Sequence, residues 1–256
     1  MRILVCVKRV PVTGGRIALS ADARAIDTRF LGFTVSPHEE CAVEEAVRLV
    51  EARGGETTVL TLGPPEAEEQ LRDAMALGAD RATLLQTDGA DWDPQATARA
   101  IARAIAELEA AGGTFDLMLF GNEAADSGDY QVGVRVANAL GLACVTGVKA
   151  LEVLDGRILA KREAAGGWEV FEMAPPALVA VREGINLPRF PSVPGRIRAK
   201  KKPVDVVAVK PDAGGQEMVL LKLPAGAGRQ AEVLGHGPEA APRVVEVLRT
   251  LGIVPS

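Results

Sequence analysis

The stretch FDLMLFGNEAADSGDYQVGVRVANAL, residues 115–140, contains the pattern that decides the fold. It begins with a near-continuous apolar run, residues 115–121, which is typical of a strand buried on both faces of a sheet. A polar loop follows, and a helix is expected from about Gln131 to Leu140. A buried strand that leads through a loop into a helix is the repeating unit of a parallel α/β sheet.

The same unit recurs upstream of this stretch. The sequence predicts strands at residues 3–7, 57–63 and 81–87, and helices at residues 36–53, 64–79 and 93–111. The first helix has clear start signals. Ser36 can act as its N-cap, Pro37 fits the first helical position, and Glu39 stands where a capping box requires an acid.

The hydrophobic pattern of the sequence changes after Gly147. The segments VKALEVLDGRILAKRE, WEVFEMA and ALVAVRE are short and alternating, and they predict antiparallel strands that extend the sheet at one edge. VDVVAVK predicts one more strand, and the Gly-, Pro- and Ala-rich end of the chain predicts an arm with a short helix. The expected fold is therefore α/β, a doubly wound, mostly parallel sheet with helices on both faces, an antiparallel edge extension and a C-terminal arm.

Composition excludes several classes of function. The 256 residues carry a net charge of -5 and only 4% aromatic side chains, which argues against nucleic-acid binding through cationic or stacking surfaces. Cys6, Cys41 and Cys144 are far apart, and the chain has two histidines, so neither a disulfide framework nor a metal site is expected. With no apolar run long enough for a signal peptide or a membrane span, we expect a cytoplasmic protein without membrane insertion.

The loop at residues 120–133 is the most informative candidate site. Ligands of open α/β sheets bind beyond the carboxyl ends of the strands, and a helix N-terminus offers free N–H groups to a phosphate. Gly128 permits close approach of the backbone. The same loop can also be a simple connector in which Asp126 and Asp129 cap the following helix, and the two commonest phosphate-binding signatures are absent.

No catalytic constellation is evident in the sequence. No nucleophile motif is present, and no cysteine can be tied to a histidine by spacing. His38 falls in the first turn of a helix, where we expect a solvated side chain. Cys6 and Cys41 are expected to be small core residues. The sequence therefore indicates a binding protein without its own active site.

Residues 189–204, RFPSVPGRIRAKKKPV, contain six basic residues and no acidic one. Pro191, Pro194 and Gly195 argue against a helix before RIRAKKK, residues 196–202, and predict a loop there. Phe190 and Val193 would then project from this loop, flanked by cations, an arrangement that suits transient contact with acidic partners. A solvated loop whose charges serve solubility is the alternative.

Together these segments resemble the beta subunit of electron transfer flavoproteins. The resemblance rests on VCVKRV, SPHEECAVEEAVRL, ALGAD, DSGDYQVG and RAKKKPV, which occur in family order and at family spacing over nearly the whole chain. It implies a heterodimer in which an alpha subunit holds a redox-active FAD, while the beta subunit binds AMP structurally and docks flavin dehydrogenases such as acyl-CoA dehydrogenases. Electrons then pass through the flavin to a respiratory acceptor.

The resemblance also implies which residues form each site. Those implied for AMP lie after the strands or in the first helical turn, and they are Cys6, Ser36, Pro37, His38, Glu39, Leu62, Phe120, Gly121, Asn122, Glu123, Ala124, Ala125, Asp126, Ser127, Gly128, Asp129, Tyr130 and Gln131. Those implied for partner docking are Val193, Arg196, Arg198, Lys200 and Lys201, with Val193 at the family's leucine position. Thr13 and His38 stand where some members carry aromatic residues near the flavin.

The implied organisation has three parts. Residues 1–188 form the α/β nucleotide-binding core, residues 189–202 the basic recognition loop, and residues 203–256 a final strand and an arm that packs on the alpha subunit. Two other functions stay open at this point. One is an electron-bifurcating flavoprotein with a second FAD in the AMP site, and the other is a stand-alone adenine-nucleotide-binding enzyme or sensor.

Overall fold

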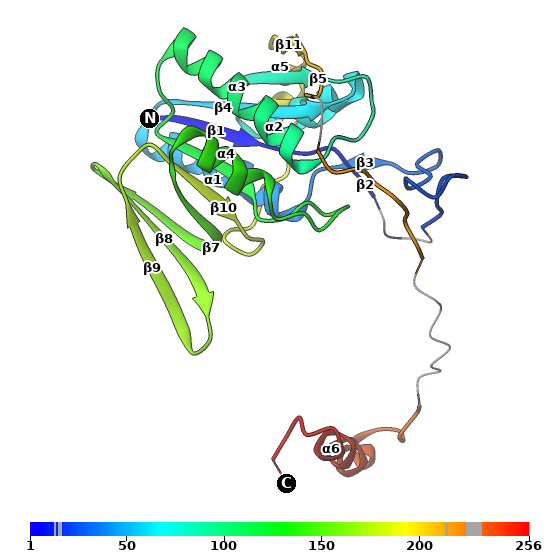
Figure 1. Cartoon of the computed structure of the whole chain (residues 1–256). Helices are drawn as coiled ribbons and strands as arrows, with labels where there is room; N and C mark the ends of the chain where they lie inside the picture. Colours follow the sequence, from blue (N-terminus) through cyan, green and yellow to red (C-terminus); the bar gives the residue numbers. More distant parts are fainter. Residues whose placement is uncertain (13, 15–16, 213–214, 224–231, 256) are drawn as a thin grey trace. The chain divides into compact units, whose positions relative to one another are not determined.

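The computed structural model of the chain describes residues 1–12, 14, 17–212, 215–223 and 232–255. Within it the chain divides into two units, Met1–Val219 and Leu220–Ser256. The first unit contains a nine-stranded sheet (Figure 1). In spatial order its strands are β11 (Asp205–Ala208), β5 (Arg81–Gln86), β4 (Glu56–Gly63), β1 (Arg2–Cys6), β6 (Leu117–Gly121), β10 (Ala177–Val181), β7 (Ala143–Leu154), β8 (Arg157–Ala164) and β9 (Gly167–Met173).

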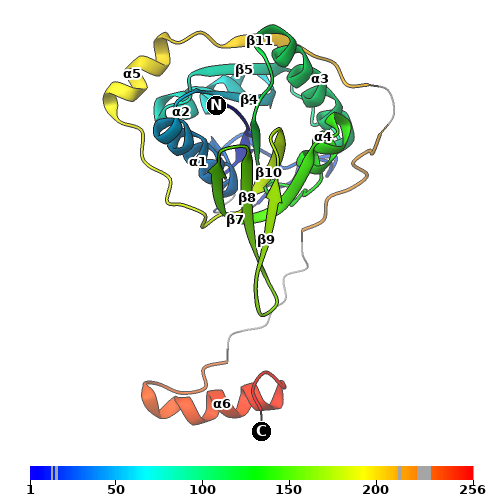
Figure 2. The same ribbon diagram turned by 90° about the vertical axis from the view of Figure 1, so that its left-hand side faces the viewer.

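Helices cover both faces of this sheet. They are α1 (Pro37–Arg53), the short 3-10 turn η1 (Pro65–Ala67), α2 (Glu68–Leu77), α3 (Pro94–Gly112), α4 (Val132–Leu140) and α5 (Val193–Lys201). Alternate residues of β1 separate the two cores. Ile3 packs in a cluster with buried residues of α1 and α2, whereas Leu4 packs with those of α3 and α4. The view along the sheet shows the two pairs of helices on opposite sides (Figure 2). The doubly wound α/β fold predicted from the sequence is confirmed.

One strand prediction was wrong. β7, β8 and β9 form the expected antiparallel extension at one edge, but β10 lies in the middle of the sheet, parallel to both β6 and β7. All five residues of β10 are buried. A continuous apolar run of this kind is required where helices cover both faces of a strand, and an edge strand needs no such run.

The prediction of a loop in the basic segment was also wrong, because residues 193–201 form α5. Ser192 is the N-cap, and its Oγ accepts a hydrogen bond from Gly195 N at 3.1 Å. Pro194 falls in the first turn, where a backbone N–H has no helical partner, so the proline opens this helix rather than preventing it. Gly195 is buried against the carbonyl of Ala76, which leaves no room for a Cβ atom.

Two smaller features complete the description. A two-stranded antiparallel ribbon, β2 (Val10–Pro11) and β3 (Phe33–Thr34), follows β1. The second unit contains the expected C-terminal helix, α6 (Ala241–Thr250), preceded by the 3-10 turn η2 (Pro238–Ala240). Over the described residues, no helix has the length and apolar character needed to cross a membrane.

Candidate nucleotide and docking sites

Three loops meet at the carboxyl edge of the parallel sheet. Cys6, the last residue of β1, pairs with Leu60 of β4 on one side and with Phe120 of β6 on the other. Because these strands are parallel and adjacent, the loops that follow them open at the same edge, where ligands of doubly wound folds bind. The first turn of α1 adjoins β6 at this edge, because a Cβ atom on Gly121 would lie 2.6 Å from Cγ of Glu39.

The first turn of α1 is fixed by a reciprocal cap. Glu39 N donates to Ser36 Oγ at 3.4 Å, and Ser36 N donates to Glu39 Oε2 at 3.2 Å. The predicted capping box is therefore confirmed. Glu39 is only 7% exposed, and its burial raises the pKa of its carboxyl to about 7. A carboxyl that is half protonated near neutral pH repels a bound anion less than a fully charged one does.

The side chain of His38 bridges two other segments at this edge. Its Nδ1 accepts a hydrogen bond from Glu183 N at 2.8 Å, so the ring proton is on Nε2, which donates to Oε1 of Glu123 at 3.1 Å. The side chain is 12% exposed. The expectation of a solvated histidine was wrong, because the loop after β6 and the residues after β10 both pack against it.

The loop at residues 120–131 is also held by an ion pair. Lys8 Nζ donates to both carboxylate oxygens of Asp126, at 2.8 and 2.7 Å. Gly128 has a φ of 63°, a conformation that glycine adopts without strain. Lys8 was not among the predicted site residues, although it belongs to the VCVKRV motif. The sequence signal that could have identified it was its position directly after a buried strand.

The N-terminus of α4 has no side-chain cap. Its N-cap residue, Gln131, makes no capping hydrogen bond, and Asp126 is paired with Lys8 instead. Asp129 Oδ1 accepts from Gln131 N at 2.8 Å, one residue before the helix begins. The amides of the first turn, at Val132 and Gly133, thus keep their capacity to bind an anion.

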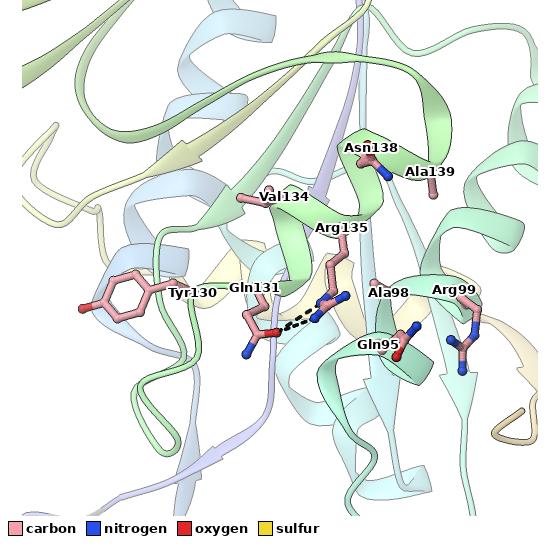
Figure 3. A pocket seen from close by; sticks show the side chains of 9 residues that line it. All are labelled: Gln95, Ala98, Arg99, Tyr130, Gln131, Val134, Arg135, Asn138 and Ala139. Carbon is pink, nitrogen blue, oxygen red and sulfur yellow. Dashed lines mark hydrogen bonds between the residues drawn. The ribbon is translucent and has the colours of Figure 1, made fainter. Parts of the chain in front are cut away.

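The structure brings together most of the residues predicted for a nucleotide. Cys6 and Phe120 pack in one cluster, and the half-buried Leu62 packs against it. Tyr130 and Gln131 instead line a groove of about 590 Å³ between α3 and α4, in which the Gln131 side chain faces Arg135 while the Tyr130 ring points away from it (Figure 3). There Arg135 donates to Oε1 of Gln131 at 3.1 and 2.8 Å. Thr13, at the second predicted flavin-side position, lies outside the described residues.

The residues predicted for docking lie on α5. Val193 is 71% exposed. The predicted docking cations are exposed as well, and they are Arg196, Arg198, Lys200 and Lys201. α5 packs on α2, where Arg72 Nη1 donates to the carbonyl of Ala199 at 2.8 Å. Sequence reasoning missed Arg72, because an arginine at this spacing from Glu68 also suits an ordinary helical ion pair.

Cys6 and Cys41 are buried core residues, and Cys144 is half-buried. Burial raises the pKa of the Cys6 thiol well above its ordinary value, and it also raises those of Cys41 and Cys144. Thiols of this kind are poor nucleophiles. Among the described residues, no group of three or more His, Cys, Asp or Glu side chains is placed to hold a metal ion.

Comparison with known proteins places the chain in a family. Residues 26–212 match the electron transfer flavoprotein domain. The chain is 39% identical over 210 residues to the electron transfer flavoprotein subunit beta of Syntrophomonas wolfei, covering 81% of this chain and 80% of that protein. It is 34% identical over 237 residues to the subunit beta of Bradyrhizobium diazoefficiens, covering 91% and 92%. It is also 36% identical over 209 residues to Protein FixA of Sinorhizobium fredii, covering 80% and 73%.

The chain therefore belongs to the electron transfer flavoprotein family. The resemblance inferred from its motifs is confirmed, and its general role is electron transfer in association with a flavin.

Proposed function

We propose that the chain is the beta subunit of a heterodimeric electron transfer flavoprotein. In this role it binds AMP as a structural ligand and helps to hold an alpha subunit that carries FAD. It docks flavin dehydrogenases, so that their electrons pass through the flavin to a respiratory acceptor. The chain itself has no active site and acts as part of an electron carrier.

The nucleotide assignment rests on the N-terminus of α4. This helix end has no side-chain cap, and it follows a loop whose acidic side chains are paired with other residues of the chain. Asp126 is neutralised by Lys8, and Glu123 accepts a hydrogen bond from His38. The acidic side chains of the loop are thus engaged within the chain, while the first-turn amides of α4 supply donors for a phosphate. This donor set fits a nucleoside monophosphate, because backbone amides bind phosphate without a lysine or a metal ion.

Docking is supported by the charge and exposure of α5. Its four exposed cations and the exposed Val193 lie on one short helix. Cations of this kind steer encounter with an acidic partner, and an apolar anchor adds burial once the partner is bound. We assign residues 203–256 to the last strand and to an arm that packs on the alpha subunit.

The test is to copurify the chain with its partner, denature the complex, and identify and count the nucleotides released. One FAD and one AMP for each heterodimer are expected. Two FAD molecules and no AMP would assign the protein to the electron-bifurcating class. ATP or ADP with no flavin and no partner would overturn the proposal in favour of a stand-alone adenine-nucleotide-binding enzyme or sensor.

A further inference from the structure

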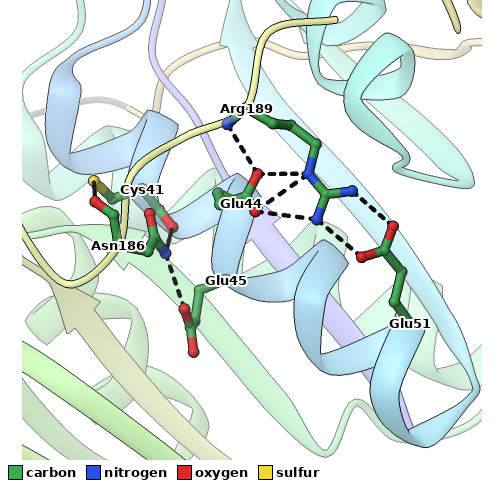
Figure 4. Close-up of polar contacts among 6 residues, drawn as sticks. All are labelled: Cys41, Glu44, Glu45, Glu51, Asn186 and Arg189. Atoms are coloured by element: carbon green, nitrogen blue, oxygen red, sulfur yellow. Dashed lines mark hydrogen bonds and ion pairs between the residues drawn. The ribbon is translucent and has the colours of Figure 1, made fainter. Parts of the chain in front are cut away.

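The segment between β10 and α5 is fastened to α1 at two points (Figure 4). At the first point, Asn186 Nδ2 donates to the carbonyl of Cys41 at 3.0 Å and to Oε2 of Glu45 at 2.9 Å. The second point is Arg189, three residues later. Ile185, just before the first point, packs against the core cluster that includes α1, whereas Leu187 and Phe190 are 90% and 96% exposed, so beyond Ile185 the segment is held to α1 by its polar groups.

Arg189 makes the stronger of the two attachments. Its Nε and Nη2 donate to the carboxylate of Glu44 at 2.9 and 3.1 Å, and its backbone N donates to the same carboxylate at 3.2 Å. Nη1 and Nη2 also reach Glu51, at 2.7 and 2.9 Å. The hydrogen bonds to Glu51 make the largest contribution to raising the pKa of Arg189, and those to Glu44 raise it further. Every nitrogen of the guanidinium is therefore occupied within the chain.

The far end of α5 is fastened in a similar way, to α2 and to the residues that directly follow α2. Lys202 Nζ donates to the carbonyl of Ala79 at 2.7 Å, and Arg72 donates to the carbonyl of Ala199. α5 thus stands between two attachments that both use basic residues of the 189–202 segment. Of the six basic residues in that segment, Arg189 and Lys202 are committed to the chain, and the other four are exposed.

We propose that Arg189 is a positioning residue for partner docking, which acts by fixing the entry to α5 on Glu44 and Glu51. This inference rests on the proposed docking role of α5. A surface held in its bound geometry loses less conformational freedom on association, so the attachment strengthens binding without touching the partner. Loss of the attachment weakens association and leaves the flavin chemistry unchanged.

The choice of variants depends on how deeply the carboxylates of Glu44 and Glu51 are buried. The side chain of Glu44 is 5% exposed, so Arg189→Met alone would leave a buried, unpaired charge and could unfold the chain. The double variant Arg189→Met with Glu44→Gln avoids that charge. Glu51→Gln removes one half of the attachment at a side chain that is 57% exposed. Arg189→Lys keeps the positive charge but loses the planar guanidinium that hydrogen-bonds to both carboxylates.

The matched control is Arg81→Met. Arg81 pairs with Glu56 at 3.3 Å and lies at the start of β5, at the opposite edge of the sheet from the ligand loops. Its loss removes a guanidinium–carboxylate pair that involves no residue of α5, and Glu56 keeps its second partner, Arg2. All variants are studied as the heterodimer with the alpha subunit, and the probe is a purified acyl-CoA dehydrogenase reduced by its acyl-CoA substrate.

Two measurements are made on each variant. Hydrogen exchange of residues 186–201 reports whether α5 has loosened, and steady-state electron transfer reports KM and kcat separately. We expect faster exchange confined to this segment and a rise of about tenfold in KM for the double variant, with kcat unchanged. Glu51→Gln and Arg189→Lys should lie between the double variant and the wild type, and Arg81→Met should match the wild type.

Other results would overturn the inference. Unchanged exchange in residues 186–201 would show that Arg189 does not hold α5, and faster exchange with an unchanged KM would show that its hold is irrelevant to docking. A fall in kcat together with loss of flavin would indicate a general structural role. If the wild-type heterodimer accepts no electrons from the dehydrogenase, the proposed docking function itself fails, and this inference fails with it.

Discussion

His38 and Glu123 join the start of α1 to the loop after β6, with Nε2 of the imidazole 3.1 Å from Oε1 of the carboxylate. The other ring nitrogen accepts a hydrogen bond from the backbone of Glu183, which follows β10. One side chain thus connects three segments that are far apart in the sequence. Since both ring nitrogens are occupied within the chain, the main effect of His38 is to hold the start of the candidate phosphate loop.

Substitution of this histidine should therefore weaken AMP retention. In His38→Ala the half-buried Glu123 loses its donor, at a cost of about 1 kcal/mol, which corresponds to a roughly fivefold loss of AMP affinity. His38→Gln retains a donor on this side chain and should lose less. The measurement is equilibrium dialysis of AMP against the heterodimer, and equal affinities in all three proteins would contradict the assigned role.

Glu39 should make stability depend on pH. Burial raises the pKa of its carboxyl from 4.5 to about 7, so between these values the folded chain holds a proton that the unfolded chain has released. The free energy of unfolding therefore falls as pH rises through this window, by about 3 kcal/mol from this group. Glu39→Gln cannot ionise and lacks this contribution.

Urea unfolding of wild type and Glu39→Gln at a series of pH values tests this prediction. The difference between the two curves isolates Glu39 from the other titrating groups. The stability of the variant relative to the wild type should rise between pH 4.5 and pH 7 and stay level above that window. Parallel curves across this range would show that Glu39 does not titrate as proposed.

The exposed anchor on α5 gives a test of docking that does not involve Arg189. Val193→Ala removes two methyl groups, which are worth about 1.6 kcal/mol if both become fully buried in a partner. The kcat/KM for electron exchange with an acyl-CoA dehydrogenase should then fall by roughly tenfold. The unfolding midpoint should not change, because Val193 is 71% exposed in the free chain.

Val206→Ala on β11 is the matched control for this variant. Val206 is also an exposed valine, at 52%, and belongs to the edge strand β11 rather than to α5. Its loss should leave electron exchange unchanged. If Val193→Ala matches this control, Val193 is not an anchor.

Local signals in the sequence were sufficient for much of the fold. The start of α1 could be predicted because Ser36, Pro37 and Glu39 form their cap within one turn of chain, with no help from other segments. The position of β10 could not be predicted in this way, because strand order depends on which strands pack together. Its unbroken apolar run did carry information, since only a strand covered on both faces needs one.

The same distinction between local signals and long-range packing applies to the site residues. The loop after β6 could be located from its position between a strand and a helix, whereas the partners of its acids could not. Lys8 and His38 reach Asp126 and Glu123 across 118 and 85 residues of sequence. Contacts of this range are set by the register of β1 beside β6, which a single sequence does not specify. The helical state of α5 likewise depends on its packing against α2.

Gly133 provides a test of the phosphate loop that depends on size alone. A Cβ atom at this position would meet the side chain of Phe120 at 3.4 Å, which is close to an ordinary van der Waals contact. Gly133→Ala should therefore be tolerated, with AMP content near that of the wild type. Gly133→Val adds two further methyl groups beside Phe120, and these must displace the first turn of α4 or the ring.

Because the proposed phosphate donors are the amides of that same turn, Gly133→Val should lower the AMP released from purified heterodimer by at least half. The measurement is the ratio of AMP to FAD in the denatured complex, since FAD serves as an internal standard for intact heterodimer. Equal ratios in Gly133→Val and Gly133→Ala would place the AMP phosphate away from α4. A fall in both AMP and FAD would indicate instead that the bulkier side chain disrupts the fold.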